Sequence, residues 1–562
     1  MPITSLYPKI DIPQTNVLTY LFGDGQNASA DPLWIDSKNP QKSLSPKQAL
    51  QWIKRLGYGL QRLGLQRGDV VMICTPNHVF VPVSYLGIVG SGCIFSGANP
   101  IFTVPELVHQ LSNTTAKAVL AHPSVLPSIL EAAAKVGIPK DRIFQFSDEQ
   151  NPVRQGVADW SAMLAAPSEA GDWKWPEFSP EEATTTIATI NYSSGTTGLP
   201  KGVCIPHSAL IANGAQTAFV RDFHPKYTDD RPGLPERWIG FLPLYHAYGQ
   251  LYANMLCIKL NVPIYIMSKF GFEDFLSTIE RYKITTLQVA PPVLIMLSKR
   301  PETLRYNLSS VSAILCGAAP LSRELQIQCE ELLNVKISQG WGMTELTCGA
   351  ISLPVGAADN KPGSVGKLLP NCECKLIGED GKEVRAGTPG ELCIRGPNVC
   401  LGYWKNEAAT KESLDEEGWF KTGDIGVCND EGLFWIVDRK KELIKVNGHQ
   451  VAPAELEAVL LENEHIADAA VVEIKLGGNE WPRAYVVIQE GSKSKITTED
   501  VQKWVAKRVS KHKRLVGGVT FIAEVPKLAS GKIMRKVMRE WSKRDAAEME
   551  RNGTVPAIWS KL

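Results

Sequence analysis

The chain has 562 residues, of which 44% are hydrophobic and 21% are charged, fractions that are ordinary for a globular protein. Lys and Arg together number 60 and Asp and Glu number 59, so a net charge of +1 gives no support to nucleic-acid or membrane-surface binding by the whole chain. The 12 cysteines form no CxxC pair and no zinc-type spacing, and we expect reduced, mostly structural thiols. The length predicts about three to five domains.

Strand-like and helix-like segments alternate through the first three-quarters of the chain, which predicts parallel sheets covered by helices. Helical patterns at 44–65, 104–112 and 125–136 alternate with strand-like runs at 70–74, 116–121 and 143–146. Further short apolar runs lie at 239–242, 264–267, 286–290 and 313–316. The segment 165–180, rich in Pro, Glu and Trp, separates two such blocks, and we interpret it as a long surface loop.

One uncharged run, 79–97, has nearly the length of a membrane span. It contains Pro82, four Gly and three Ser, and it follows the strand-like stretch VVMIC. Because true spans keep their apolar residues continuous, we expect a buried helix–turn–strand here and no membrane span.

After residue 370 the pattern changes to short strands with Gly or Asp turns, which predicts a smaller β-rich subdomain at about 371–438. From 439 a mixture of helices and strands returns. It includes helical patterns at 452–461 and 497–509 and an amphipathic one at 533–549. We therefore divide the chain into an N-terminal part, 1–438, and a C-terminal part, 439–562.

The stretch YSSGTTGLPKGV at 192–203 follows the strand-like run 184–192 and precedes the helical pattern at 207–219. Its glycines permit positive φ and let backbone N–H groups point inward together, and Lys201 adds a cation. Its hydroxyl donors are Ser193, Ser194, Thr196 and Thr197. It is not the Walker pattern, because Gly202 and Val203 follow the lysine. We predict a polyphosphate-binding loop between a strand and a helix.

This string resembles the phosphate-binding signature of adenylate-forming enzymes, a group of acyl- and aryl-CoA synthetases, luciferases and peptide-synthetase adenylation domains. Family-like strings follow in order: PLYHAYG at Pro243, CGAAPLS at Cys316, QGWGMTE at Gln339, GELCIRG at Gly390, KTGDIG at Lys421, DRKKELIKVNGHQVAPAELE at Asp438 and PKLASGKIMRK at Pro526. The resemblance spans roughly residues 45–536 and is closest to the 4-coumarate–CoA ligase branch. It implies an α/β fold with two helix-covered sheets, a β-rich subdomain and a small, mobile α+β C-terminal domain.

The resemblance implies a two-step reaction. A carboxylate attacks the α-phosphate of ATP to give an acyl-adenylate and pyrophosphate, and the thiol of coenzyme A then displaces AMP. The first step joins two anions, so it needs positive charge and positioning more than a general base. The expected cofactors are ATP, Mg²⁺ and coenzyme A as co-substrate.

The family's nucleotide contacts transfer to positions that match its motifs. We expect Trp341 to stack on adenine in place of the usual Tyr, and Asp424 to accept from both ribose hydroxyls. Arg439 is a second ribose or phosphate contact, or alternatively half of a plain surface pair with Asp438. The predicted ATP- and AMP-binding residues are Ser193, Ser194, Gly195, Thr196, Thr197, Gly198, Lys201, Gly317, Ala318, Ala319, Gln339, Gly340, Trp341, Gly342, Met343, Thr344, Asp424, Ile436, Arg439, Lys441 and Gln450.

The resemblance assigns catalytic roles to five residues. Lys532 is expected to neutralise the charge that gathers at the α-phosphate. Glu345 is expected to hold Mg²⁺, and Thr344 to contact the α-phosphate. His246 orients the carboxylate, and Lys445 enters the site for thioester formation.

The transferred pocket for the acid consists of His246, Ala247, Tyr248, Tyr252, Ala318, Gly340, Gly342, Cys348, Gly349 and Ala350. Tyr248 is expected either to bond a ring hydroxyl or simply to pack. Gly349 and Ala350 replace two larger aliphatic residues of the ligase branch, so we expect a larger far end of the pocket. Aryl acids such as cinnamate-, phenylacetate- or benzoate-like compounds are the first expectation, and medium-chain fatty acids the second.

Coenzyme A contacts are expected at Lys269, Asn447 and Gly448, with rotation of the C-terminal part about Lys441. Asn447 stands where the ligase branch commonly has Lys, which puts that contact in doubt. For Lys269, a solvated strand end is an equal alternative.

Rival functions are a luciferase-like oxygenase, an enzyme that loads a carrier protein, and a nucleotide-binding protein without activity. No carrier domain follows Lys532 in this sequence, and the retained Glu345, Asp424, Arg439 and Lys532 argue against loss of activity. The final tripeptide, Ser560-Lys561-Leu562, matches an address for import into peroxisomes, the alternative being a random polar tail. We favour the address and expect a peroxisomal import receptor as a partner. The sequence indicates no oligomeric state.

Overall fold

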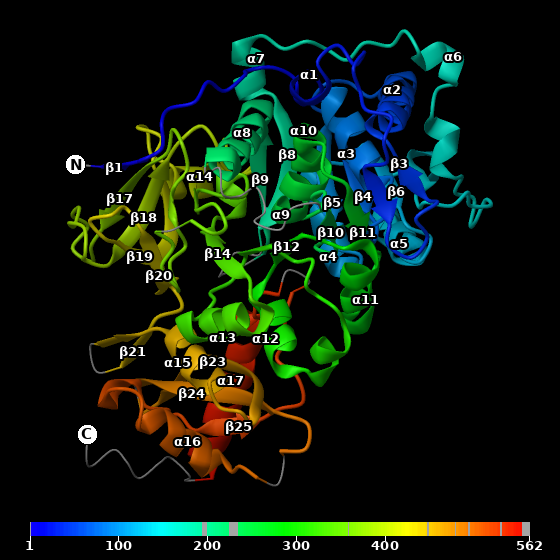
Figure 1. Ribbon diagram of the computed structural model, residues 1–562. Coiled ribbons are helices and arrows are strands. Elements are labelled where there is room, and N and C mark those ends of the chain that lie inside the picture. The colour runs from blue at the N-terminus through cyan, green and yellow to red at the C-terminus, as the bar shows by residue number, and fades with distance from the viewer. Residues whose placement is uncertain are drawn as a thin grey trace.

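The computed structural model describes residues 2–193, 199–223, 234–357, 359–446, 449–477, 479–492, 495–528 and 531–552. It contains a six-stranded and a nine-stranded sheet, a separate five-stranded sheet, and two smaller sheets near the C-terminus. In Figure 1 the blue-to-green α/β part lies above, the yellow five-stranded sheet lies to one side, and the orange and red C-terminal elements lie below. The predicted fold class is confirmed, while the division at 438/439 stays a prediction.

The six-stranded sheet is mostly parallel, as the alternating pattern predicted. The run 79–97 forms helix α3 (Val81–Gly90) and most of strand β5, so the prediction of a buried helix–turn–strand is confirmed. Among the described residues, no helix is both long and apolar enough to cross a membrane. In sheet order, the strands are β7 (Ile143–Gln145), β6 (Ala118–Ala121), β4 (Val70–Cys74), β5 (Ile94–Ala98), β8 (Ile187–Ser193) and β9 (Lys201–Pro206). The helices of this part are α1 (Val17–Phe22), α2 (Pro46–Arg62), α4 (Val104–Thr114) and α5 (Leu126–Val136).

Strand β9 was not predicted. We expected the glycine-rich string to join a strand to a helix, but β9 pairs antiparallel with β8 before helix α8 (His207–Phe223) begins. The short apolar run VCIP continues a strand, and a Cβ at Gly202 would lie 2.7 Å from Ile190 and 3.4 Å from Trp404. The two described ends of the string therefore lie in paired antiparallel strands, with Ser193 opposite Lys201.

The nine-stranded sheet supplies the second half of the α/β part. Its central strands are parallel, and the connecting helices are α11 (Phe272–Tyr282), α12 (Pro291–Lys299) and α13 (Arg323–Leu333). In order, the strands are β16 (Lys367–Leu368), β15 (Ile351–Ser352), β14 (Lys336–Trp341), β13 (Ala313–Cys316), β12 (Thr286–Val289), β10 (Trp238–Gly240), β11 (Ile264–Ile266), β2 (Trp34–Asp36) and β3 (Ser43–Leu44).

The segment 165–180 is mostly exposed, as expected of a surface loop, but it is not entirely irregular. It contains helix α6 (Pro167–Ala170), leads into α7 (Pro180–Thr185), and buries Trp173 against α2. The indole of Trp173 donates to Gln61 Oε1 at 3.0 Å, and a Cβ on Gly57 would lie only 2.3 Å from its ring. The sequence did not predict this packing of Trp173 on the helix.

The predicted β-rich subdomain forms a five-stranded sheet with one addition. Strand β1 (Ile3–Thr4) pairs with β17 at its edge, although it lies at the other end of the sequence. The other strands are β17 (Glu373–Ile377), β18 (Gly390–Arg395), β19 (Phe420–Cys428) and β20 (Phe434–Arg439), with helix α14 (Glu407–Ser413) between β18 and β19.

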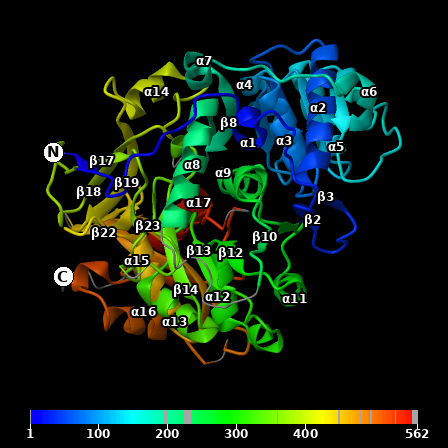
Figure 2. The same cartoon turned by 45° about the horizontal axis from the view of Figure 1, so that its top comes forward.

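The C-terminal elements form an α+β unit with its own buried core. Figures 1 and 2 show this unit against α12 and α13, the helices of the nine-stranded sheet that lie nearest to it. Its elements are the hairpin β21 (Ile444–Val446) and β22 (His449–Val451), then α15 (Pro453–Leu461), β23 (Ile466–Leu476), β24 (Asn479–Ile488), α16 (Thr498–Ala506), β25 (Val519–Phe521) and α17 (Arg535–Arg551).

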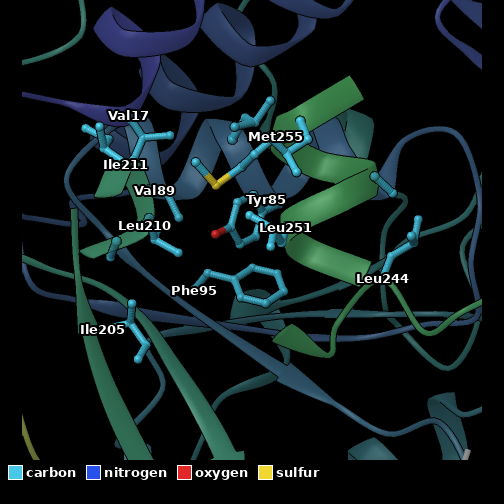
Figure 3. Packing of buried hydrophobic residues seen from close by; sticks show 14 of the residues in the cluster. Val17, Tyr85, Val89, Phe95, Ile205, Leu210, Ile211, Leu244, Leu251 and Met255 are labelled. Atoms are coloured by element: carbon cyan, nitrogen blue, oxygen red, sulfur yellow. The ribbon is translucent and has the colours of Figure 1, made fainter. Parts of the chain in front are cut away.

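A continuous apolar core fixes the helix on which the predicted acid pocket lies. This helix begins as α9 (Ala247–Gly249), passes through a π-helical stretch, η4 (Gln250–Leu256), and ends as α10 (Cys257–Leu260). Figure 3 shows Leu251 and Met255 packed around Tyr85, next to Phe95. The rings of Tyr85 and Phe95 meet edge to face at 4.9 Å between centroids.

Candidate active site

The chain folds back on itself directly after strand β14. A Cβ on Gly342 would lie 1.8 Å from the carbonyl oxygen of Cys348, so a side chain at this position is sterically excluded. The turn that results, η6 (Thr344–Leu346), places Glu345 where it is 5% exposed. The hydroxyl of Tyr403 donates to Glu345 Oε1 at 3.1 Å, so the buried carboxylate has a hydrogen-bond donor.

Asp424 lies opposite Arg439 in the β19–β20 ladder, and their side chains meet at 3.5 Å. The indole Nε1 of Trp341 donates to Asp424 Oδ2 at 2.9 Å. Burial raises the pKa of Asp424, and the charge of Arg439 and the bond from Trp341 act against that rise. Trp341 therefore donates a hydrogen bond from the edge of its indole to the predicted ribose-binding carboxylate. The sequence did not predict this contact.

Lys532 belongs to the C-terminal unit and extends toward Asp424 and Arg439. Hydrogen bonds from Leu528 N to Lys532 O and from Gly531 N to Leu528 O, both 2.8 Å, form the turn before it. Gly531 has a φ of +84°, and a Cβ there would lie 3.1 Å from Pro292. Burial and the charge of Arg439 lower the pKa of Lys532, while Asp424, Glu345 and Cys348 act in the opposite direction. The structure thus brings the predicted catalytic lysine together with the two predicted carboxylates.

His246 caps α9 and lies near the same lysine. Its Nδ1 accepts from Tyr248 N at 3.4 Å. Burial, followed by the nearby charge of Lys532, lowers the pKa of His246 to about 4. The imidazole is therefore neutral at pH 7 and can donate or accept one hydrogen bond without adding charge.

Aromatic side chains continue the site from His246 along η4. Tyr248 is buried beside Ala247, and its hydroxyl donates to Leu315 O at 3.2 Å. Its ring meets Tyr252 edge to face at 5.2 Å, and Tyr252 meets Trp238 at 5.7 Å. These contacts line the region next to Lys532 and His246 with ring surfaces.

The strand ends beside these rings bring backbone close to the site. A Cβ on Gly317 would lie 3.5 Å from the Tyr248 ring, and one on Gly340 would lie 3.5 Å from Ile351 O. Ala318 follows with a φ of +72°, an unusual conformation for a residue with a Cβ, and Ala319 is half-buried. These small residues keep the predicted base-binding edge open.

Not every predicted nucleotide residue points a side chain into the site. The amide of Gln339 donates to Leu321 O and Gln326 Oε1 at 3.2 and 2.9 Å, so it ties strand β14 to helix α13. Met343, Thr344 and Ile436 are half-buried near the turn and on β20.

At the predicted far end of the acid pocket, the carbonyl of Gly349 accepts from the amides of Asn213 and Asn398 at 2.7 and 2.8 Å, and Ala350 is fully buried. Whether the small side chains enlarge the pocket for the acid stays a prediction. A hollow of about 50 Å³ has Tyr252 among its lining residues. Its other lining residues are Thr217, Val220, Arg221, Trp238, Leu256, Leu260, Thr286, Gln288, Leu315, Ser352, Leu353, Pro354, Val355 and Leu369.

The phosphate-binding string is described only at its two ends. Ser193 ends β8 and Lys201 begins β9, with Lys201 Nζ 4.9 Å from the centre of the Tyr403 ring. Ser194, Gly195, Thr196, Thr197 and Gly198 lie outside the described residues, as do Asn447, Gly448 and the final tripeptide.

The residues predicted for the thioester step do not gather around Lys532. Lys445 and Gln450 face each other on the exposed hairpin β21–β22, and the amide of Gln450 contacts Glu379, which lies in the turn after β17. Lys441 lies in an exposed turn after β20, and Lys269 is exposed after β11.

Two residues of the site carried no usable sequence signal. Tyr403 follows a glycine in a loop, and Lys299 is one of many lysines at a helix end. The ammonium of Lys299 donates to the carbonyls of Leu461 and Ile466, which belong to the C-terminal unit. Only the folded arrangement reveals either contact.

Comparison with known proteins agrees with this geometry. The chain matches the model of the AMP-binding enzyme family over residues 26–404 and the model of the AMP-binding enzyme C-terminal domain over 455–532. It is 38% identical over 547 residues to phenylacetyl-CoA ligase epaB of Aspergillus niger, covering 95% of this chain and 98% of that one. It is 35% identical over 546 residues to 4-coumarate-CoA ligase 1 of Narcissus pseudonarcissus, covering 95% of each.

Solved structures show the same fold. ATP-bound MatB of Rhodopseudomonas palustris superposes with a TM-score of 0.81 at 25% identity, over 94% of this chain and 99% of that one. The anthranilate CoA ligase AuaEII superposes with a TM-score of 0.84 at 23% identity, over 96% and 99%. The chain therefore belongs to the AMP-binding enzyme family and is an AMP-forming acid–CoA ligase that uses ATP and coenzyme A.

Proposed function

We propose that the preferred acid is an aryl acid of the cinnamate, phenylacetate or benzoate type. The observation that supports it most directly is the edge-to-face pair of Tyr248 and Tyr252 beside His246 and Lys532. Aromatic rings favour such offset contacts with further rings, so a flat acid would complete the stack. Relatives named for phenylacetate and 4-coumarate support the same class.

In this proposal the side chains act mainly by position and charge. The ammonium of Lys532 lies between the approaching carboxylate and the α-phosphate and offsets the negative charge that gathers there. Asp424 and Arg439 hold the ribose, and the neutral His246 orients the acid. Since two anions react, a fixed cation contributes more than proton transfer does.

We propose that Glu345 holds Mg²⁺ in the adenylation step. No cluster of three or more His, Cys, Asp or Glu side chains that could hold a metal occurs within the described part of the chain. Mg²⁺ is commonly bound by one or two carboxylates plus substrate phosphates and water, so a single buried carboxylate fits an ion that arrives with ATP. The ion would neutralise phosphate charge.

The orientation described here suits adenylation, because Lys532 lies beside Asp424 and Glu345. We propose that the C-terminal unit turns about Lys441 for thioester formation and brings Lys445, Asn447, Gly448 and Gln450 to the site, with Lys269 near the phosphates of coenzyme A. The exposed positions of Lys445 and Gln450 leave the hairpin accessible for that movement.

A medium-chain fatty acid is the second candidate. The hollow behind Tyr252 supports it, because Leu256, Leu260, Leu353 and Leu369 are among its lining residues. A flexible chain that passed Tyr252 would bury methylene groups there at about 0.8 kcal/mol each.

An acid panel decides between the candidates. Purified enzyme is given ATP, Mg²⁺ and each acid, with and without coenzyme A, and pyrophosphate, AMP and thioester are measured separately. We expect the highest kcat/KM with a phenylacetate- or cinnamate-type acid. A higher value for octanoate than for every aryl acid would contradict the proposal.

We also propose import into peroxisomes through Ser560-Lys561-Leu562. A fluorescent protein placed before residue 1 should collect in peroxisomes, and a variant lacking the last three residues should not. Cytosolic fluorescence of the first fusion would contradict it.

A further inference from the structure

Residues 398–404 form a segment that runs between the phosphate-loop hairpin and the turn that holds Glu345. On one side it pairs with strand β9. The hydrogen bonds there are Leu401 N to Cys204 O (2.9 Å), Cys204 N to Gly402 O (2.9 Å) and Trp404 N to Gly202 O (2.7 Å).

On its other side, the 398–404 segment bonds the residues around η6. Cys400 N donates to the backbone carbonyl of Glu345 at 2.9 Å. Thr347 Oγ1 donates to Asn398 O at 2.8 Å, and Asn398 Nδ2 donates to Leu346 O at 3.2 Å. One short segment therefore fixes the distance between the two parts of the chain that are expected to hold phosphate and metal.

The side chain of Tyr403 makes a second connection between the same two parts of the chain, within the site. Its hydroxyl donates to Glu345 Oε1 at 3.1 Å, and its ring lies 4.9 Å from the ammonium of Lys201. The same residue thus contacts a predicted metal-holding anion and a predicted phosphate-holding cation.

We propose that Tyr403 is a positioning residue for adenylation. Its hydroxyl fixes the rotation of the Glu345 carboxylate, and its ring holds the Lys201 ammonium at a set distance from that carboxylate. Without it, each long side chain would have to be ordered when magnesium nucleotide binds, which weakens binding. This inference rests on the magnesium site proposed above.

Two variants separate the contacts. Tyr403→Phe keeps the ring beside Lys201 and removes the donor to Glu345, whereas Tyr403→Leu removes both. Tyr485→Phe is the matched control, because it also removes a tyrosine hydroxyl that contacts a carboxylate, at 2.7 Å from Asp545, in the C-terminal unit. Thermal unfolding of the full-length variants checks that each one folds.

The first measurement is the binding of Mn²⁺, followed by electron paramagnetic resonance, to enzyme saturated with α,β-methylene-ATP. We expect Tyr403→Phe to weaken Mn²⁺ binding roughly tenfold, the effect of losing a hydrogen bond to a charged group. Tyr485→Phe should bind Mn²⁺ like the wild type. Thioester formation from supplied acyl-adenylate should be unchanged in both variants, because that step no longer needs the triphosphate.

The second measurement is the affinity for the same nucleotide without metal. We expect the wild type and Tyr403→Phe to agree and Tyr403→Leu to bind about threefold more weakly, the effect of one cation–π contact. Equal Mn²⁺ affinity of the wild type and Tyr403→Phe would overturn this inference alone. Equal metal-free affinity of Tyr403→Leu and the wild type would overturn its Lys201 part. A wild type that binds no Mn²⁺ would overturn the magnesium site as well.

Discussion

The charges of Asp424, Glu345 and Arg439 all act on the pKa of Lys532, and Asp424 and Arg439 form an ion pair. In a partly buried group, each charge is tolerable only with opposite partners nearby. The site has two positively and two negatively charged side chains, so a triphosphate and a carboxylate would add negative charge to a nearly neutral site. Lys532 is the member that arrives from a different part of the molecule.

Replacing Lys532 with alanine should slow adenylation by a factor of about 100 to 1000, the usual cost of losing a preorganised charge at the reacting centre. Exchange of labelled pyrophosphate into ATP measures this step. Thioester formation from supplied acyl-adenylate should change little, because the proposed role of the lysine is at the α-phosphate of ATP. Equal loss in both steps would contradict the assigned role.

The contact between Trp341 and Asp424 gives a second prediction. Trp341→Phe keeps an aromatic face but removes the donor at 2.9 Å, so the pKa of Asp424 should rise further above its usual range. A protonated carboxyl accepts less well from the ribose hydroxyls. We expect KM for ATP to rise about tenfold, with a larger rise at pH 6 than at pH 8.

The control for Trp341→Phe is 2′,3′-dideoxy-ATP, which offers Asp424 no ribose hydroxyl. Its KM should be almost the same in the wild type and the variant. If ATP and the dideoxy analogue are affected equally, Trp341 supports adenine binding and not the ribose contact.

At the scale of elements, the π-helical stretch η4 determines how the acid pocket ends. A π-helical stretch shifts the faces of the residues that follow it, and such stretches recur at functional sites. Here Tyr252 packs edge to face against Tyr248 and also lines the hollow of about 50 Å³. The length of acid that fits is therefore expected to depend on this one side chain.

Tyr252→Ala should join the hollow to the acid pocket. We expect the ratio of kcat/KM for octanoate to that for an aryl acid to rise at least tenfold, since two or more methylene groups would find a place there at about 0.8 kcal/mol each. The loss of a partly buried ring should lower the free energy of unfolding by about 3 kcal/mol. Tyr252→Phe retains the ring and should keep the original preference.

The sequence predicted many of the long elements and missed several short ones. The alternation of helices and strands, α17 and the run 79–97 were predictable because their hydrophobic periodicity extends over many residues. Strand β9 was hidden by the Gly- and Pro-rich string before it, and β1, with two residues, has no periodicity to detect. Trp173 was missed because its burial depends on a partner helix more than 100 residues away.

Some residues of the site could be predicted from the sequence and others could not. Lys532, Glu345, Asp424 and Arg439 belong to ordered strings that can be recognised in the chain. Tyr403 was not predicted, because its partner Glu345 lies 58 residues away and nothing local signals the pair.

At the scale of the whole molecule, both ends of helix α12 contact the C-terminal unit. Pro292 lies beside the turn of Gly531 at the start of the helix. At the other end, Lys299 Nζ donates to Leu461 O at 2.8 Å, a contact between residues 162 positions apart. Burial lowers the pKa of Lys299 to about 8, so the ammonium form predominates at pH 7.

Lys299→Met should remove the hydrogen bonds of this side chain to the C-terminal unit and keep most of its volume. We expect pyrophosphate exchange to fall about tenfold, since two hydrogen bonds from a charged donor to backbone carbonyls are lost. Thioester formation from supplied adenylate should stay the same or rise. A fall in both steps would mean that Lys299 supports folding and not this orientation.

Lys441→Pro tests the rotation from the opposite direction. Proline fixes φ at the proposed hinge, so the C-terminal unit should have difficulty turning. We expect nearly normal pyrophosphate exchange and a loss of thioester formation of about tenfold or more. Unimpaired overall turnover would count against the rotation.

The edge strand β1 pairs with residues that are synthesised much later than it is. Ile10 N donates to Asn371 Oδ1 across 361 residues of sequence, next to the pairing of Ile3 with Cys374. At about 5–20 residues per second, a ribosome needs roughly 20–70 s to supply that partner. Strand β1 is therefore synthesised that long before its partner β17, and it can join the five-stranded sheet only after β17 has been made.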